Sequence, residues 1–170
     1  MTSARTFSLL AAATVVSGWL AGAALERSAV GVRIWLTMGV ESWATFSRGA
    51  VSGLTIDGFL GVAATALIIG AAMSATFDRD SDRVTPAPLI VAAAFSVLGL
   101  LLTAKAMSLV QLLAASPPAA DLPPIFQAYL IWGVDFRAAA AAVAFVAVVW
   151  TLFDLSAAPQ RSGAVETPAE

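Results

Sequence analysis

Four apolar stretches, each about as long as a bilayer core is thick, constrain this chain more than any other feature of its sequence. The first runs from Thr6 to Leu25, between Arg5 and Glu26, and contains no charged residue. Its 20 residues span roughly 30 Å at about 1.5 Å per residue, which matches the hydrocarbon thickness of a membrane. Similar stretches cover about residues 58–77, 88–115 and 125–154. The sequence therefore predicts four transmembrane helices.

The composition favours the same fold class. Of the 170 residues, 59% are hydrophobic and 12% are charged, whereas a soluble domain has about 25% charged residues. The apolar surface must therefore face lipid. We expect an all-α polytopic membrane protein, an antiparallel bundle of four transmembrane helices that forms a single domain over residues 1–156. The segment 157–170 lacks apolar periodicity and is expected to be a disordered tail.

The first apolar stretch also has features of a secretory signal. Arg5 precedes it, and the small residues of Ala21–Ala23 are typical of a cleavage site. Its length and the three spans that follow favour a retained transmembrane helix, and cleavage stays open as the alternative.

The connections between the spans differ in character. The first, Glu26–Ile56, is 31 residues long, which is unusual for a structureless loop. It contains Trp35, Trp43 and Phe46 among scattered charges, a pattern typical of a partly helical segment at the membrane interface. The charged run 78–83 predicts a short solvated turn.

The positive charges give the expected orientation. With four spans both termini lie on one side, together with Arg5, Arg79, Arg83 and Arg161, against Arg27, Arg33 and Arg48 on the other. The positive-inside rule then places both termini in the cytoplasm, and we expect the bacterial inner membrane.

Several classes of function are excluded by missing residue types. The chain has no His and no Cys, which removes haem ligation by these residues, zinc sites, iron–sulfur clusters and thiol chemistry. We expect no metal and no cofactor. The net charge of -2 argues against a nucleic-acid partner, which requires a basic surface.

Charged residues inside the last two spans are the main candidates for a site. By helical rise, Lys105, Asp135 and Arg137 all lie about 25–29 Å from the inner end of their helices. Such charges pair, line a cavity or have a function. Asp135 and Arg137 are two residues apart, so they point about 200° apart. We expect Lys105 to pair with Asp135, and Arg137 with Glu41 of the first connection; a purely structural role for these pairs is the alternative.

Several fragments resemble a known family. They are 18–28 (GWLAGAALERS), 39–48 (GVESWATFSR), 101–105 (LLTAK) and 132–137 (WGVDFR). Together they are similar to small four-helix membrane proteins of the anthrone-oxygenase-like family, over about residues 8–154. The resemblance implies the four-helix fold and an important role for Trp132 and Arg137. Relatives often have Asn before this arginine and a His near the start of the helix, and this chain has neither.

Two functions remain open, together with the expected partners. The first is binding or oxygenation of a small apolar molecule, aromatic or quinone-like, at a charged cluster in the outer half of the bundle. A carboxylate would take a proton and a cation would stabilise the resulting anion. The candidate catalytic residues are Asp135, Arg137, Lys105 and Glu41, and the candidate ligand-binding residues are Trp132, Arg48, Trp43 and Tyr129.

The alternative is a non-enzymatic accessory or structural subunit of a membrane complex, since small residues suited to helix packing are abundant. The expected partners are the lipid bilayer, a small apolar ligand, and a second copy or another membrane subunit. A transporter or channel is weaker, because no helix is polar along its length and no inverted repeat is evident.

Overall fold

The computed structural model describes residues 4–49, 51–77, 86–115 and 117–157, and these residues form helices and short connections without any strand. The long helices are α1 (Ala4–Glu26), α4 (Val51–Phe77), α5 (Pro86–Ala114) and α7 (Phe136–Ala157). Shorter ones are η1 (Arg27–Gly31), α2 (Val32–Met38), α3 (Val40–Gly49), η3 (Ala119–Asp121), α6 (Leu122–Ala128) and η4 (Tyr129–Asp135). The turn predicted at 78–83 and the tail predicted beyond Ala157 lie outside the described residues.

Four continuous helical stretches are long and apolar enough to cross a membrane: Ala4–Met38, Thr55–Phe77, Pro86–Leu113 and Ala119–Ser156. They coincide with the four predicted spans, and the all-α bundle is confirmed. The first and last are longer than predicted, because helical backbone continues past both ends of the apolar core.

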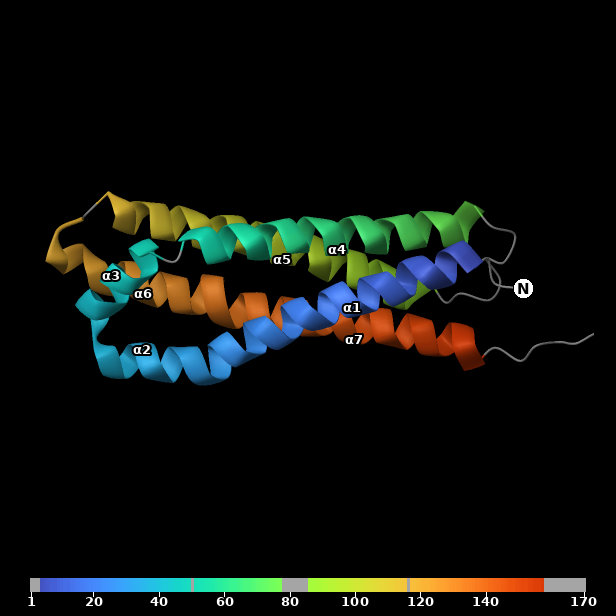
Figure 1. Ribbon diagram of the computed structural model, residues 1–170, viewed down its shortest axis with the longest axis horizontal. Helices are drawn as coiled ribbons and strands as arrows, with labels where there is room; N and C mark the ends of the chain where they lie inside the picture. Colours follow the sequence, from blue (N-terminus) through green and yellow to red (C-terminus); the bar gives the residue numbers. More distant parts are fainter. Residues whose placement is uncertain (1–3, 50, 78–85, 116, 158–170) are drawn as a thin grey trace, which may run out of the picture.

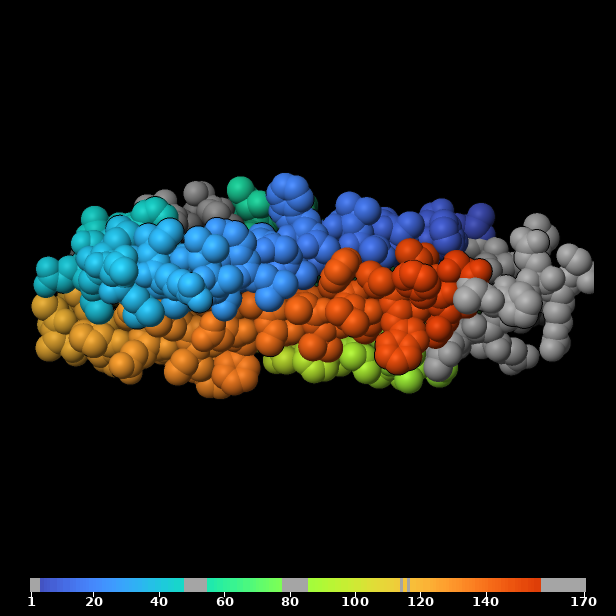
Figure 2. All heavy atoms as spheres, turned by 90° about the horizontal axis from the view of Figure 1, so that it is seen from below, coloured from blue at the N-terminus to red at the C-terminus, as the bar shows by residue number. Residues whose placement is uncertain are grey.

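The four long helices form an elongated bundle in which helices next to each other in sequence pack side by side (Figure 1). The contacts close a ring in the order α1, α4, α5, α7, with α7 returning to α1. Figure 2 shows α1 and α2 running alongside η4 and α7 along one face. The start of α1 and the end of α7 lie at one end of the bundle, and α2, α3 and α6 gather at the other.

The first connection does not leave the helix at Glu26, as the apolar stretch suggested. Backbone hydrogen bonding runs on through η1 and α2 to Met38, and the chain then reverses at Gly39, whose φ of 82° and ψ of 159° suit glycine alone. The amide of Trp43 donates to the carbonyl of Gly39 at 3.0 Å, which starts α3 on its return path. The expected partly helical segment is therefore a helical hairpin.

Two apolar clusters hold the bundle together, one toward each end. The first cluster, toward the end of the bundle where α1 starts, joins the four long helices around Leu10, Ile68, Ala92 and Val148, all fully buried. Hydroxyl pairs link neighbouring helices in the same part of the bundle, Thr6 with Ser74 at 2.8 Å and Thr65 with Ser96 at 2.7 Å. Hydrogen bonds of this kind are worth about 0.6 kcal/mol on average within membranes.

The second cluster is an aromatic cap over the opposite end. Trp43 of α3 is completely buried and packs on Phe126 and Tyr129, with ring centroids 4.6 and 5.3 Å apart. Trp35 of α2 contacts Tyr129 at 6.0 Å. The expectation that Trp43 lies at the membrane interface is therefore corrected: it is a core residue, because the hairpin turn at Gly39 folds α3 onto α5 and α6.

Two π-helical turns face each other below this cap. η1 and η4 are in contact, and the hydroxyl of Ser28 in η1 donates to Oδ1 of Asp135 at the end of η4, at 2.9 Å. π-turns are rare and are often found at functional sites. Both turns flank the charged residues described next.

Candidate functional site

A small cavity lies in the middle of the bundle, between the two apolar clusters. Its volume is about 60 Å³, and all four long helices line it. The lining positions recur about once per helical turn, as single residues or adjacent pairs, so each helix presents one face to the cavity. They are Ser17, Leu20, Ala23 and Ala24 of α1; Asp57, Gly61 and Ala64 of α4; Phe95, Ser96, Gly99, Leu100 and Thr103 of α5; and Arg137, Ala141 and Ala144 of α7.

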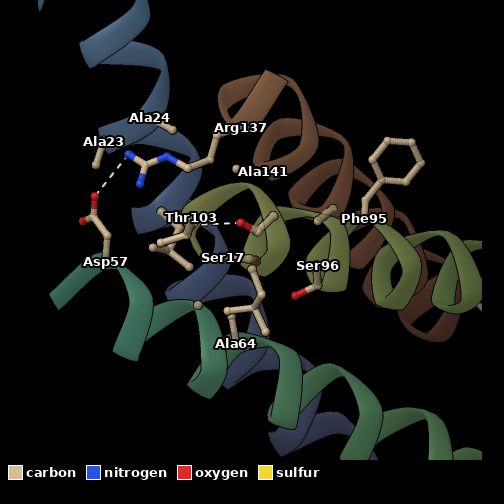
Figure 3. Close-up of a pocket in the computed structure, with 15 residues that line it drawn as sticks. Ser17, Ala23, Ala24, Asp57, Ala64, Phe95, Ser96, Thr103, Arg137 and Ala141 are labelled. Atoms are coloured by element: carbon tan, nitrogen blue, oxygen red, sulfur yellow. Dashed lines mark hydrogen bonds and ion pairs between the residues drawn. The ribbon is translucent and has the colours of Figure 1, made fainter. Parts of the chain in front are cut away.

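Small side chains create this space. Alanine and glycine make up about half of the lining, and they let four backbones surround a gap without filling it. Gly61 keeps α4 close to α5, since a Cβ at this position would come within 2.9 Å of Cδ2 of Leu100. Figure 3 shows the lining side chains around the cavity, with Arg137 and Asp57 at one end of it.

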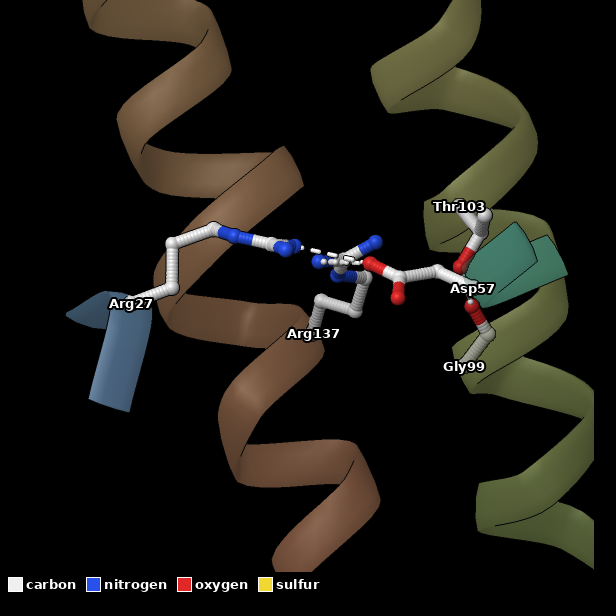
Figure 4. Close-up of polar contacts among 5 residues, drawn as sticks. All are labelled: Arg27, Asp57, Gly99, Thr103 and Arg137. Atoms are coloured by element: carbon white, nitrogen blue, oxygen red, sulfur yellow. Dashed lines mark hydrogen bonds and ion pairs between the residues drawn. The ribbon is translucent and has the colours of Figure 1, made fainter. Parts of the chain in front are cut away.

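Three charged residues meet at this end of the cavity. Oδ2 of Asp57 accepts a hydrogen bond from Nη1 of Arg27 at 2.8 Å and another from Nη2 of Arg137 at 3.2 Å (Figure 4). Arg137 is 6% exposed, and the Arg27 and Asp57 side chains are 26% and 18% exposed. We call Arg27, Asp57 and Arg137 the charge cluster. Counted by formal charge, the cluster has one positive charge in excess.

Arg137 has a donor left over. Its Nη1 is buried and has no hydrogen-bond partner among the described residues. None of the three hydroxyls that line the cavity accepts from this nitrogen: Ser17 donates to the carbonyl of Ala13, Thr103 donates to that of Gly99, and Ser96 pairs with Thr65. A guanidinium keeps its charge in proteins, and a buried unpaired donor costs about 1–3 kcal/mol, more when it is charged. The cavity therefore contains an unmet demand for a hydrogen-bond acceptor.

The charge cluster lies at one depth. Asp57 is 20 residues from Phe77 at the end of α4, and Arg137 is 20 residues from Ala157 at the end of α7. Both are thus about 30 Å from the end of the bundle that carries the start of α1. Their charges lie near one face of the hydrocarbon layer, where the cost of inserting them is lowest.

Tyr129 connects the charge cluster to the aromatic cap. This candidate ligand-binding residue is buried against Trp43 and Trp35 and interacts electrostatically with Arg137, Arg27 and Asp57. It does not line the cavity. Tyr129 is therefore a residue of the aromatic cap that neighbours the charge cluster.

The structure does not form the expected pair between Lys105 and Asp135. Lys105 is exposed, because it follows the cavity-lining Thr103 by two residues and so points to the opposite side of α5. Asp135 is exposed and accepts from Ser28. Arg137 points inward and Asp135 outward; the two-residue spacing predicts opposite directions but not which residue faces the bundle.

The remaining sequence candidates lie away from the cavity. Glu41 is exposed in the first turn of α3, and the expected contact with Arg137 is absent, because Arg137 is held by Asp57. Trp132 is 44% exposed and stacks on Phe136 at 5.1 Å. Arg48 belongs to α3, and its side chain lies outside the described part of the structure.

Sequence reasoning missed Asp57 and Arg27, because Asp57 borders the second apolar stretch and Arg27 belongs to the first connection. The depth calculation that singled out Arg137 also applies to Asp57, which is equally far from the inner end of its helix. That coincidence of depth was the signal that could have identified the pair.

No protein-family profile, curated protein or solved structure matches this chain. The resemblance to the anthrone-oxygenase-like family therefore rests on the short motifs alone. Within the described residues, no group of three or more Asp, Glu, His or Cys side chains could hold a metal ion.

Proposed function

We propose that this protein is an integral membrane protein that binds a small, largely apolar molecule in the central cavity, with Arg137 donating a hydrogen bond to an oxygen of that molecule. The observation that carries this proposal is the buried, unpartnered Nη1 of Arg137, a residue that lines a cavity of mainly apolar side chains. Ligand sites commonly combine an apolar wall with a few placed polar groups.

The dimensions limit what can enter. Pockets for drug-sized ligands have volumes of about 300–1,000 Å³, whereas this cavity measures about 60 Å³. That volume favours a small polar head over a fused-ring system. Leu20, Phe95 and Leu100 are only half-buried, so the apolar wall extends to the outer surface of the bundle. An apolar tail would leave the cavity between the helices and continue into the lipid.

The site supports binding better than acid–base catalysis or conduction. Among the described residues, Asp57 is the sole carboxylate that lines the cavity, and its Oδ2 already accepts from both arginines. Asp135 and Glu41, the expected proton acceptors, are exposed elsewhere. Packed apolar clusters adjoin the cavity on both sides along the bundle axis, which suits a binding site rather than a pore.

The proposal is tested by native mass spectrometry and solvent extraction of the purified protein. An apolar compound with a polar oxygen should be retained by the native chain and lost from Arg137→Ala. Ala141→Leu, which fills the cavity but keeps all three charges of the cluster, should lose the compound as well. The matched control is Lys105→Ala, which removes an exposed cation at a similar depth and should retain it. Retention in Ala141→Leu, or phospholipid as the only bound molecule in the native protein, would contradict the proposal.

The proposed location is the bacterial inner membrane with both termini in the cytoplasm, as the distribution of arginines favours. Because the chain has no cysteine, single-cysteine variants report directly on which side of the membrane a position lies. A membrane-impermeant maleimide should label Glu41→Cys in intact cells and Arg5→Cys only after permeabilisation. The reverse pattern would invert the proposed orientation.

A further inference from the structure

The net charge of the charge cluster restricts the chemistry of the ligand further than the need for a hydrogen-bond acceptor does. Resting on the proposed function, we propose that the ligand's head is a carboxylate, so that the bound molecule is a monoanionic amphiphile with an apolar tail. The cluster combines two guanidinium groups with one carboxylate, and a single negative charge in the cavity would make it neutral.

The local charge balance supports a charged rather than a neutral head. Nη1 of Arg27 and Nη2 of Arg137 donate to the same oxygen, at 2.8 and 3.2 Å, so these two nitrogens lie within about 6 Å of each other. Among the described residues, the ionisable groups that interact electrostatically with Arg137 are Arg27, Asp57 and Tyr129. The acidic Glu26 and Asp135 are exposed to solvent instead. One positive charge of the cluster therefore has no counter-charge among the described residues.

The geometry of the free donor fits a carboxylate head. A hydrogen bond from a guanidinium group to an ionised acceptor is roughly twice as strong as one between neutral groups. In Arg137, Nη2 is engaged by Asp57 and Nη1 is free, so a second carboxylate can be added without displacing the first. A three-atom planar head also suits a volume of about 60 Å³ better than a phosphodiester with its two substituents.

The test compares decanoate with decanamide, which has the same chain length and keeps a carbonyl acceptor but has no charge. Binding of each radiolabelled probe is measured to the full chain in phosphatidylcholine nanodiscs, with empty discs as the reference for partitioning. The native protein should bind decanoate well above empty discs and decanamide at least about tenfold more weakly, as expected for a charge at this distance.

Two variants separate the contribution of charge to binding from the contribution of cavity shape. Arg27→Gln removes the excess charge without altering the cavity lining, and should weaken decanoate binding about tenfold while leaving decanamide unchanged. The matched control is Arg5→Gln, the same change at an exposed position at the far end of α1. It should alter neither probe.

The outcomes distinguish this inference from the proposed function. Equal binding of the two probes, or decanoate binding that is insensitive to Arg27→Gln, would overturn the monoanion while the mass-spectrometric test of the cavity stands. If decanoate binds no better to the protein than to empty discs, the assignment of a carboxylate amphiphile is overturned in the same way. If phosphatidylglycerol in the discs abolishes decanoate binding, the anion is a lipid phosphate and the carboxylate assignment is wrong.

Discussion

Asp57 is the residue whose removal tests the charge cluster most directly. Asp57→Asn keeps the shape and one acceptor oxygen but leaves two guanidinium groups without a counter-charge. The Arg137 side chain is 7% exposed, and removing one partner of a buried ion pair costs about 3–5 kcal/mol. The more exposed contact with Arg27 adds at most about 1 kcal/mol. Because asparagine still accepts one hydrogen bond, we expect a loss of about 3 kcal/mol, more than a hundredfold in the unfolding equilibrium constant.

The measurement is equilibrium unfolding in mixed micelles with increasing sodium dodecyl sulfate, followed by tryptophan fluorescence. Asp135→Asn is the matched control, since it makes the same change to an exposed carboxylate at a similar depth and should cost less than about 0.5 kcal/mol.

A double-mutant cycle then isolates the pair. Combining Asp57→Asn with Arg137→Gln should destabilise the protein by about 1–3 kcal/mol less than the sum of the single changes. Equal losses for Asp57→Asn and Asp135→Asn, or additive single changes in the cycle, would refute the buried pairing.

Three further predictions concern the backbone and the aromatic cap, all measured in the same unfolding assay. Gly39→Ala should destabilise the hairpin by about 1–3 kcal/mol, since its φ of 82° strains any other residue; an unchanged stability would contradict the turn. Gly133→Ala should also destabilise the protein, because the new Cβ would lie 3.0 Å from the ring of Tyr129. Gly22→Ala should leave the stability unchanged, because its new Cβ would meet no atom within 4 Å beyond its own helix backbone. Trp43→Ala should cost about 3–5 kcal/mol, and a loss under 1 kcal/mol would mean that the side chain is not buried.

The sequence was sufficient for the number and approximate bounds of the spans, because hydropathy and length are properties of single segments. The opposite directions of Asp135 and Arg137 followed from their spacing for the same reason, although the spacing does not say which of the two faces the bundle. The pairing partners of the charged residues were harder to predict, since pairing depends on how the helices are rotated about their axes relative to one another. Lys105 and Asp135 were matched by depth alone, yet depth leaves the helical face undetermined, and both side chains point away from the cavity.

The charge cluster escaped prediction for a different reason. Asp57 and Arg27 end apolar stretches, and residues in such positions ordinarily lie in solvent. Here the helices continue beyond them, by six residues on the N-terminal side of Asp57 and by eleven on the C-terminal side of Arg27. Charges at the edge of a hydropathy window are thereby placed inside the bundle.

The facing π-turns η1 and η4 have a consequence for how insertions and deletions would act on this fold. A π-turn holds about one residue more than an α-turn, so the chain beyond it is rotated by roughly 100° relative to an uninterrupted helix. Deleting one residue within Arg27–Gly31 would turn α2 as a rigid cylinder and carry Trp35 away from Tyr129, while the contacts of α1 would stay in place. The two π-turns therefore set how far the helices of the cap are rotated about their axes relative to the membrane-spanning bundle. Each part keeps its own helical register.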